Sequence, residues 1–327
     1  MNKTALTRFV ATLTKEHPLS IYSGSPFYAE FEQKICSLQL SQSKIDEKIE
    51  ELLKDNGKFS IFKYNQGIAE LLIWFWLESN NIPYQIEKTV NGTEKNVDAQ
   101  AQYNSIFYNI EIKSPEYEEH KAGHLCGIIA NRTEGKELIN LAEHIRSILQ
   151  NQMPTQGYSD VDIELPHDNK VKSALTFAQG KFSENSNSSC NILFIATTTA
   201  EFLKYLNYII NGQTGFFTPH SFMPHADFNK VKAIVLSNAI SLHQQYDDKS
   251  WDISNAINLV LSNPYCEYED CSILNGILQI FPHQTIEFFN GLEEFRKERS
   301  DDGRPMPDYI YFTDYVAKHG FNLNKNI

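Results

Sequence analysis

Two neighbouring stretches of the chain alternate apolar and polar residues. The period of two in residues 97–103, and again in residues 106–113, predicts two β-strands joined by a short polar turn. A hairpin turn at this place sets Asp98 opposite Glu111, with their β-carbons about 4.5 to 5.5 Å apart. Lys113 leaves the same face two residues after Glu111. The pattern therefore predicts two acids and a lysine on one face of a sheet.

The residues before this hairpin predict a third strand and a helix. Residues 84–90 alternate as a strand, and the Asn-Gly pair that follows predicts a tight type I′ turn, which sets Ile86 opposite Val97. Residues 64–79 are apolar on nearly every side, which is typical of a buried helix. The helix and the three strands agree in register, so they are expected to fold as one unit.

Gln66 and Glu70 lie one turn apart on the predicted buried helix and share one of its faces. A buried carboxylate needs a partner, because an unpaired buried charge costs several kcal/mol or more. Glu70 either belongs to a buried network or an ion pair with an arginine or lysine, or it faces the acids of the hairpin. Gln66 would then lie beside it at the same place.

Opposed carboxylates repel one another unless a positive charge lies between them. For Asp98 and Glu111 a divalent metal ion is the natural candidate, and ligands made only of oxygen favour Mg²⁺ or Mn²⁺ over zinc. The ammonium of Lys113 would reach a phosphate beside the ion. This combination of groups is typical of hydrolysis at phosphorus.

Asp98, twelve intervening residues and then Glu111-Ile112-Lys113 resemble the signature of the PD-(D/E)XK nuclease superfamily, which has the restriction-endonuclease-like fold. The resemblance implies that Asp98, Glu111 and the backbone carbonyl of Ile112 are metal ligands and that Lys113 is the catalytic lysine. Many members also place an acid on the helix before the sheet, which implies that Glu70 completes the metal site. Val97 stands where the signature often has proline.

The rest of the chain predicts further elements of an α/β fold. Residues 135–150 have the spacing of a helix that packs on the sheet, and continuous apolar runs at 191–198 and 231–237 predict strands buried on both faces. Loops are predicted at residues 114–135 and 151–169, and helices from residue 251 onward.

The order of helix, three strands, helix and strand resembles the αβββαβ core of the same superfamily. We therefore expect an α/β fold with a restriction-endonuclease-like mixed sheet flanked by helices and a mainly helical C-terminal part. Three regions are predicted: a helical or irregular extension at 1–60, the nuclease-like core at 61–240 and a helical C-terminal region at 241–327.

Polar residues near the predicted acids are candidates for contact with a substrate. Gln66 is one, and Gln100 follows Asp98 on the same face of its strand. Residues 170–182 predict a short helix that presents Lys172 and Lys181, and this most basic patch near the site is expected to contact backbone phosphates.

Composition sets limits on these expectations. Hydrophobic residues make up 41% and charged residues 21% of the 327 positions, which are ordinary globular values. No apolar run approaches the length of a membrane span, and no secretion leader is recognisable, so we expect a cytoplasmic protein without membrane contact. Five cysteines without CxxC spacing predict free thiols. The net charge of −12 argues against general affinity for polyanions, so binding to nucleic acid should depend on metal and salt.

The function expected from the sequence is a metal-dependent endonuclease acting on nucleic acid, with DNA as the expected form. By analogy alone, it would serve in restriction or phage defence. Cutting both strands uses two sites, so a homodimer or a partner protein is expected. The alternative is a catalytically inactive restriction-endonuclease-like scaffold or a nucleic-acid-binding subunit of a larger complex, which the acidic net charge and the motif-free C-terminal part favour.

Overall fold

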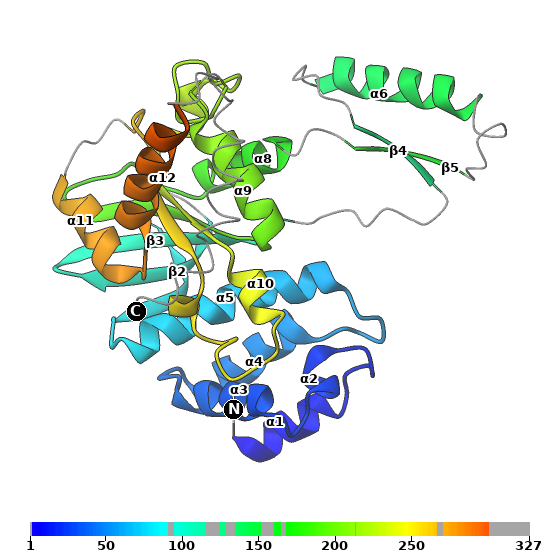
Figure 1. Ribbon diagram of the computed structural model, residues 1–327. Helices are drawn as coiled ribbons and strands as arrows, with labels where there is room; N and C mark the ends of the chain where they lie inside the picture. The colour runs from blue at the N-terminus through cyan, green and yellow to red at the C-terminus, as the bar shows by residue number, and fades with distance from the viewer. Residues whose placement is uncertain are drawn as a thin grey trace.

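A six-stranded mixed β-sheet forms the centre of the protein (Figure 1). The computed structural model describes residues 2–90, 95–115, 124–128, 135–151, 160–164, 168–212, 214–266 and 271–300. The strand order is β1-β2-β3-β6-β7-β8; β1, β2 and β3 are antiparallel, β3, β6 and β7 run parallel, and β8 is antiparallel to β7. The strands are β1 (Tyr84–Thr89), β2 (Asn96–Tyr103), β3 (Ile106–Lys113), β6 (Ser189–Ala196), β7 (Ala233–Ser237) and β8 (Asn258–Ser262).

Helices cover both faces of this sheet, which gives three layers. One layer holds α1 (Lys3–Val10), α2 (Pro18–Ile21), α3 (Pro26–Ser37), α4 (Gln42–Leu53), α5 (Ile61–Ser79), α10 (Ala239–His243) and α11 (Cys271–Ile280). The other holds α8 (Asp168–Gln179), α9 (Thr199–Ile210) and α12 (Thr285–Ser300). Figure 1 shows α1 to α5 and α10 below the sheet, α8, α9 and α12 above it, and α11 beside its left end. The structure thus confirms the α/β class and the flanking helices.

Strand β6 is buried on both faces, as its continuous apolar run predicted. Ile192 and Phe194 belong to the core under α5, whereas Leu193 and Ile195 belong to the core under α8 and α9. All four side chains are fully buried. Because successive side chains of a strand point to opposite faces, an uninterrupted apolar run suits a strand covered on both sides.

Helix α5 is the buried helix predicted from its apolar sequence. The side chains from Leu71 to Phe75 are all buried, and the helix packs against β2 and β3. Gly67 allows α4 to come close, since a β-carbon at this position would lie 2.4 Å from the backbone oxygen of Leu52. The helix therefore stands at a fixed depth beneath the strands that carry the predicted acids.

The predicted register of the β2–β3 hairpin is confirmed. Tyr103 pairs with Ile106, and the ladder continues to Ala99 opposite Ile110. Asn104 and Ser105 both have positive φ, at 48° and 66°, as a two-residue type I′ turn requires. One step further, the same register sets Asp98 against Glu111.

The predicted register of the β1–β2 hairpin is wrong by two residues. Ile86 pairs with Ala99, not with Val97, and the ladder closes at Thr89 with Asn96. The proposed Asn-Gly turn at 91–92 and its pair of residues 90 and 93 lie wholly or partly outside the described residues. A shift of two keeps each side chain on its predicted face of the sheet.

Two predicted loops each contain a strand. β4 (His124–Ile128) and β5 (Asp160–Glu164) pair in parallel as a separate two-stranded sheet. The predicted helix 135–150 exists as α6 (Gly135–Gln150), but it packs on β5, and Figure 1 shows it away from the large sheet. The helix that packs on the large sheet in place of α6 is α8, which lies between β3 and β6 in the sequence and contacts β6.

The C-terminal part is not simply helical. The first predicted helix after residue 251 is replaced by a 3-10 turn, η2 (Ile253–Asn255), and by β8, which completes the sheet. A short apolar run such as 258–262 does not distinguish a buried strand from a helix. The helices expected after it are confirmed as α11 and α12, and residues from 301 onward lie outside the described part.

Two expectations about chemistry and membranes can be compared with the described residues. Cys36, Cys190 and Cys266 are free thiols. No helix in the described ranges has both the length and the apolar character needed to cross a membrane.

Candidate functional site

The predicted acids meet where β2 and β3 separate. Pairing between the two strands ends at Ala99 and Ile110. Beyond it, the backbone N–H of Ile112 donates a 2.7 Å hydrogen bond to Oδ2 of Asp98. A carboxylate therefore takes the place of a backbone partner, and this holds Asp98 against the end of β3.

Glu111 is fully buried between two lysines. Its Oε1 lies 2.7 Å from Nζ of Lys113, and its Oε2 lies 2.7 Å from Nζ of Lys181. Neither contact has hydrogen-bond angles, so both are close ion pairs. Nζ of Lys181 also lies 3.3 Å from Oδ1 of Asp98. One ammonium thus bridges the two carboxylates that the hairpin brings together.

The electrostatics of this cluster follow from its burial. Burial raises the pKa of the Glu111 carboxyl, and the negative charge of Asp98 adds to the effect, while Lys113 and Lys181 oppose it. Burial alone would lower the pKa of the Lys181 ammonium, but the charges of Asp98 and Glu111 outweigh it, so that pKa is raised. The two ammonium groups offset part of the cost of burying the Glu111 carboxylate.

Helix α5 brings Gln66 and Glu70 to the same place from the other layer. Nε2 of Gln66 donates to Oε1 of Glu70 at 2.9 Å and to the carbonyl of Ile112 at 3.1 Å, and Oε1 of Gln66 accepts from the N–H of Ser114 at 2.8 Å. Burial, together with the charge of Asp98, raises the pKa of Glu70 from 4.5 to about 7. Glu70 therefore holds its proton to a higher pH than an exposed glutamate does.

Helix α8 supplies an aromatic face to this cluster. The Phe177 ring centroid lies 4.1 Å from Nζ of Lys113 and 5.0 Å from Nζ of Lys181. An aromatic face attracts a cation within about 6 Å. Phe177 therefore helps to hold both ammonium groups over the sheet, although half of its own surface stays exposed.

The structure brings together most of the residues predicted from the sequence. Gln66 and Glu70 come from α5, and Lys181 follows α8; the hairpin supplies the remainder, which are Asp98, Glu111, Ile112 and Lys113. Gln100 lies further along β2, where its Nε2 donates to Oδ1 of Asn109 at 2.7 Å. Lys172 is directed elsewhere, with Nζ 5.9 Å from the Phe222 ring centroid.

Sequence reasoning missed two features of the site. Lys181 was expected to meet phosphate, but in the structure it pairs with both acids of the hairpin. In the sequence, nothing about Phe177 indicated a role at the site, apart from its place in a predicted helix. Both residues lie between 66 and 83 positions after Asp98 and Glu111 in the sequence, so only the packing of α8 on the sheet makes the connection.

The oxygen atoms at this place have the chemistry of a site for a hard divalent ion. The resemblance implied Asp98, Glu111, Glu70 and the carbonyl of Ile112, which are all oxygen donors. In the described residues, no three His, Cys, Asp or Glu side chains are gathered as a ready ligand set. Lys181 stands between Asp98 and Glu111 and meets the same negative charge that an ion would. In the structure the cation that these two carboxylates share is the ammonium of Lys181.

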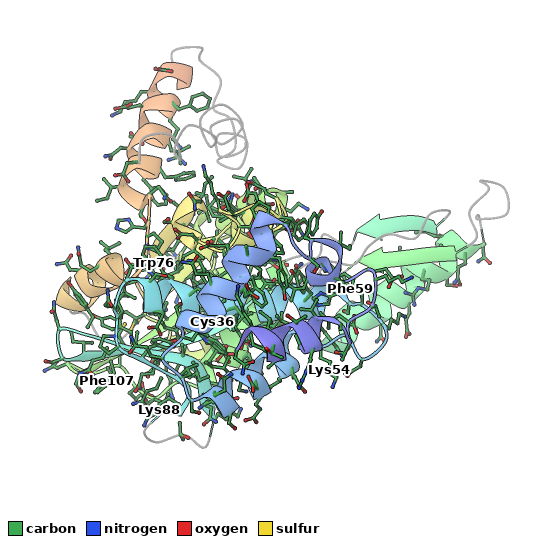
Figure 2. The ribbon with its side chains drawn as sticks, turned by 90° about the horizontal axis from the view of Figure 1, so that it is seen from below. Cys36, Lys54, Phe59, Trp76, Lys88 and Phe107 are labelled. Atoms are coloured by element: carbon green, nitrogen blue, oxygen red, sulfur yellow. The ribbon has the colours of Figure 1, made fainter. Side chains whose placement is uncertain are left out.

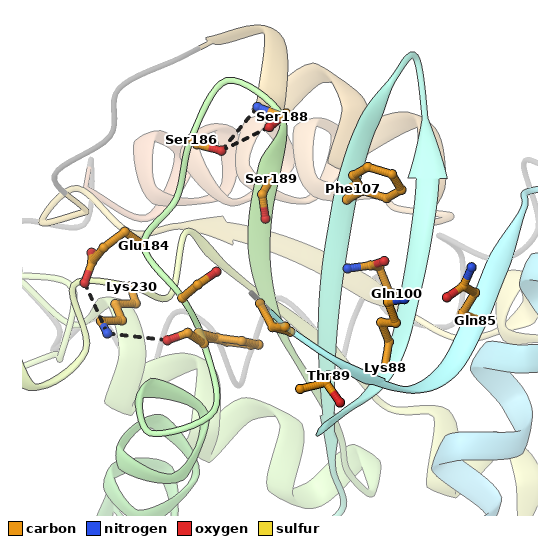
Figure 3. Close-up of a pocket in the computed structure, with 13 residues that line it drawn as sticks. Gln85, Lys88, Thr89, Gln100, Phe107, Glu184, Ser186, Ser188, Ser189 and Lys230 are labelled. Atoms are coloured by element: carbon orange, nitrogen blue, oxygen red, sulfur yellow. Dashed lines mark hydrogen bonds and ion pairs between the residues drawn. The ribbon is translucent and has the colours of Figure 1, made fainter. Parts of the chain in front are cut away.

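Two cavities flank this cluster on the α8 side of the sheet. The larger, of about 770 Å³, lies over the first part of β3 and is lined by Gln100, Phe107 and Phe182, among others (Figure 3). The smaller, of about 350 Å³, is lined by Lys113 and Phe177, among others. Lys113, which lines the smaller cavity, and Asp98 keep part of their side chains exposed, whereas Glu111 is fully buried.

No protein-family model, curated protein or solved structure matches this chain. The interpretation of the site therefore depends on the residues and their geometry. The coordinates establish an α/β fold with a six-stranded mixed sheet between helices, and a cluster of carboxylates and ammonium groups where β2 and β3 separate.

Proposed function

We propose that this protein is a metal-dependent nuclease that hydrolyses phosphodiester bonds in nucleic acid, with DNA as the expected substrate. The observation that carries the proposal is the bridge made by one ammonium, 3.3 Å from Asp98 and 2.7 Å from Glu111. Two carboxylates held this close create a strong binding point for a cation. A second ammonium, that of Lys113, stands beside it on the same strand.

The proposed cofactor is Mg²⁺ or Mn²⁺, held by Asp98, Glu111 and the carbonyl of Ile112, with Glu70 as a further ligand. Such an ion supplies a Lewis acid for the phosphate and lowers the pKa of water. Three acids share two ammonium groups at this place, and Glu111 is fully buried between the two lysines. Binding an ion would relieve the repulsion among those acids.

The protein's own residues would divide the remaining work. Lys113, steadied by the Phe177 ring, would stabilise negative charge that develops on the phosphate. Glu70, whose pKa is about 7, could instead take a proton from the attacking water at neutral pH. Gln66 holds Glu70 in position through its 2.9 Å hydrogen bond.

A second candidate function is a scaffold or nucleic-acid-binding subunit without catalysis. The specific observation in its favour is that both oxygens of Glu111 are already paired with lysines. The net charge of −12 also favours it, since most nucleic-acid-binding surfaces are basic. A role in restriction or phage defence, a cytoplasmic location, and a homodimer or partner protein stay predictions from the sequence.

The test is a cleavage assay with plasmid, linear duplex, single-stranded DNA and RNA, each in Mg²⁺, Mn²⁺ or EDTA. We expect cleavage in either metal and none in EDTA. Asp98→Asn and Lys113→Ala should each lower kcat by about a hundredfold or more, since each removes a group that stabilises the transition state. Lys204→Ala is the control, because in the described part of the chain Lys204 makes only an exposed ion pair with Glu201 on α9.

Two results would contradict the nuclease proposal. Cleavage that survives EDTA, or that Asp98→Asn leaves unchanged, would place the activity elsewhere. Binding to nucleic acid without cleavage of any substrate in any metal would favour the scaffold function instead.

A further inference from the structure

The larger cavity has the chemistry of a site for a nucleobase. It lies on the same side of the sheet as the acids: Gln100 follows Asp98 by two residues on β2, and Phe107 precedes Glu111 by four on β3. Its volume of about 770 Å³ is in the range of small-molecule sites. The strands and the segment after Lys181 therefore join the cavity directly to the acid cluster.

Phe107 provides an open aromatic face in this cavity. Phe107 is 40% exposed. The alternation of β3 would equally allow a polar residue at this exposed position. In Figure 3 the ring lies beside Gln100 on the neighbouring strand, and Figure 2 shows Phe107 and Lys88 at the same side of the molecule. An exposed ring of this kind can stack on the flat face of a base.

Amide groups around Phe107 can read the edge of such a base. Asn109 fixes the orientation of Gln100, because its Oδ1 accepts from Nε2 of Gln100 at 2.7 Å. Asn109 is itself buried and donates to Oδ1 of Asn191 at 2.8 Å and to Oγ of Ser189 at 3.0 Å. This chain of buried amides holds Gln100 rigidly at the cavity wall, as a recognition group requires.

Two lysines add positive charge at the cavity's edges. Lys230 is paired with Glu184 at 3.1 Å. Lys88 is exposed and makes no ion pair with any residue in the described ranges, so its ammonium is available to a phosphate. Base stacking with a nearby cation is the usual combination in proteins that bind single strands.

We propose that this cavity takes an unpaired nucleobase of a nucleic-acid strand whose neighbouring phosphate lies at the acid cluster. The inference rests on the proposed nuclease function and narrows its substrate to single-stranded or locally opened nucleic acid. A base inside a duplex is stacked on both faces and paired along one edge, so it cannot offer a face to Phe107. Gln100 would then contact the base edge, and Lys88 an adjacent phosphate.

Binding is tested with cleavage suppressed, by fluorescence anisotropy in Mg²⁺ at low salt in the Lys113→Ala background, with a labelled single-stranded oligonucleotide and its duplex. We expect the single strand to bind more tightly than the duplex. Phe107→Leu should weaken single-strand binding roughly 5- to 100-fold, because it removes one stacking platform, and Phe107→Tyr should restore it. Ile21→Ala, a change at an exposed apolar residue of α2, serves as the matched control and should bind as wild type does.

A second variant tests the cavity independently of Phe107. Lys88→Ala should reduce the slope of log K against log salt by about 0.7, the value for one phosphate contact on a single strand. Equal or tighter binding of the duplex, or unchanged binding by both Phe107→Leu and Lys88→Ala, would overturn the inference. Single-strand binding that depends on Phe107 but leads to no cleavage in Mg²⁺ would keep the inference and remove the nuclease function. Cleavage at the same rate by wild type and by Phe107→Leu would keep the nuclease function and remove the inference about the cavity.

Discussion

Replacing Glu70 by glutamine should make the protein more stable at neutral and alkaline pH. The carboxyl lies in a buried network with Gln66 and close to the charge of Asp98, which raises its pKa from 4.5 to about 7. The folded protein therefore holds the proton of Glu70 more tightly than the unfolded chain does. Its protonation contributes stability that is complete below pH 4.5 and is lost as the pH rises through about 7.

The size of the effect follows from the two pKa values. The interval from 4.5 to about 7 corresponds to about 3 kcal/mol, at 1.36 kcal/mol for each pKa unit. Glutamine has the same shape, and its side-chain oxygen can still accept the hydrogen bond from Gln66. The free energy of unfolding of Glu70→Gln should thus match wild type near pH 4.5 and exceed it by up to about 3 kcal/mol above pH 7.

The measurement is urea unfolding of both proteins in EDTA at intervals from pH 4.5 to 8.5. Glu47→Gln, at an exposed position of α4, gives the baseline for loss of one surface carboxylate. A constant difference between Glu70→Gln and wild type across this range would refute the reasoning, because it would mean that Glu70 titrates alike in the folded and unfolded states. If Glu70 holds a metal, Mg²⁺ should stabilise wild type more than Glu70→Gln.

Two further substitutions test the packing around the site, each by urea unfolding at pH 7. Lys181→Met should lower the free energy of unfolding by roughly 2 to 4 kcal/mol, because it leaves the buried Glu111 with one cation. The control is Lys204→Met, which removes an exposed ion pair and should lower the free energy of unfolding by less than about 1 kcal/mol. Equal losses for the two lysines would contradict the buried bridge. Gly67→Ala should cost roughly 1 to 3 kcal/mol, since its β-carbon would meet a backbone oxygen at 2.4 Å, whereas Gly212→Ala meets open space. A Gly67→Ala protein as stable as Gly212→Ala would show that α4 and α5 do not pack this closely.

Local pattern was enough to predict the parts of the fold that depend on neighbouring residues. The period of two in β2 and β3, with a two-residue turn, fixed which side chains share a face, so Asp98, Glu111 and Lys113 could be placed together. Local pattern failed where the connection was longer. The predicted β1–β2 register assumed a two-residue Asn-Gly turn, whereas the last described pair, Thr89 with Asn96, encloses six residues.

Local pattern also could not decide whether a short apolar run forms a strand, a helix or part of a loop. The run at 258–262 forms β8 because β7 offers a free edge and α12 covers the strand, and neither condition is visible in the run itself. The strands β4 and β5 were hidden for a similar reason, since each is five residues long and finds its partner far along the chain.

By itself, then, the sequence determined the α/β class, the buried helix α5 and the face on which the hairpin carries its acids, because these depend on periodicity over a few residues. Only the tertiary structure decided what surrounds those acids. Lys181 reaches Asp98 and Glu111 because α8 packs on β6, and Glu70 reaches them because α5 lies beneath the end of β3. Contacts between distant segments follow from how whole layers pack, and no local periodicity records them.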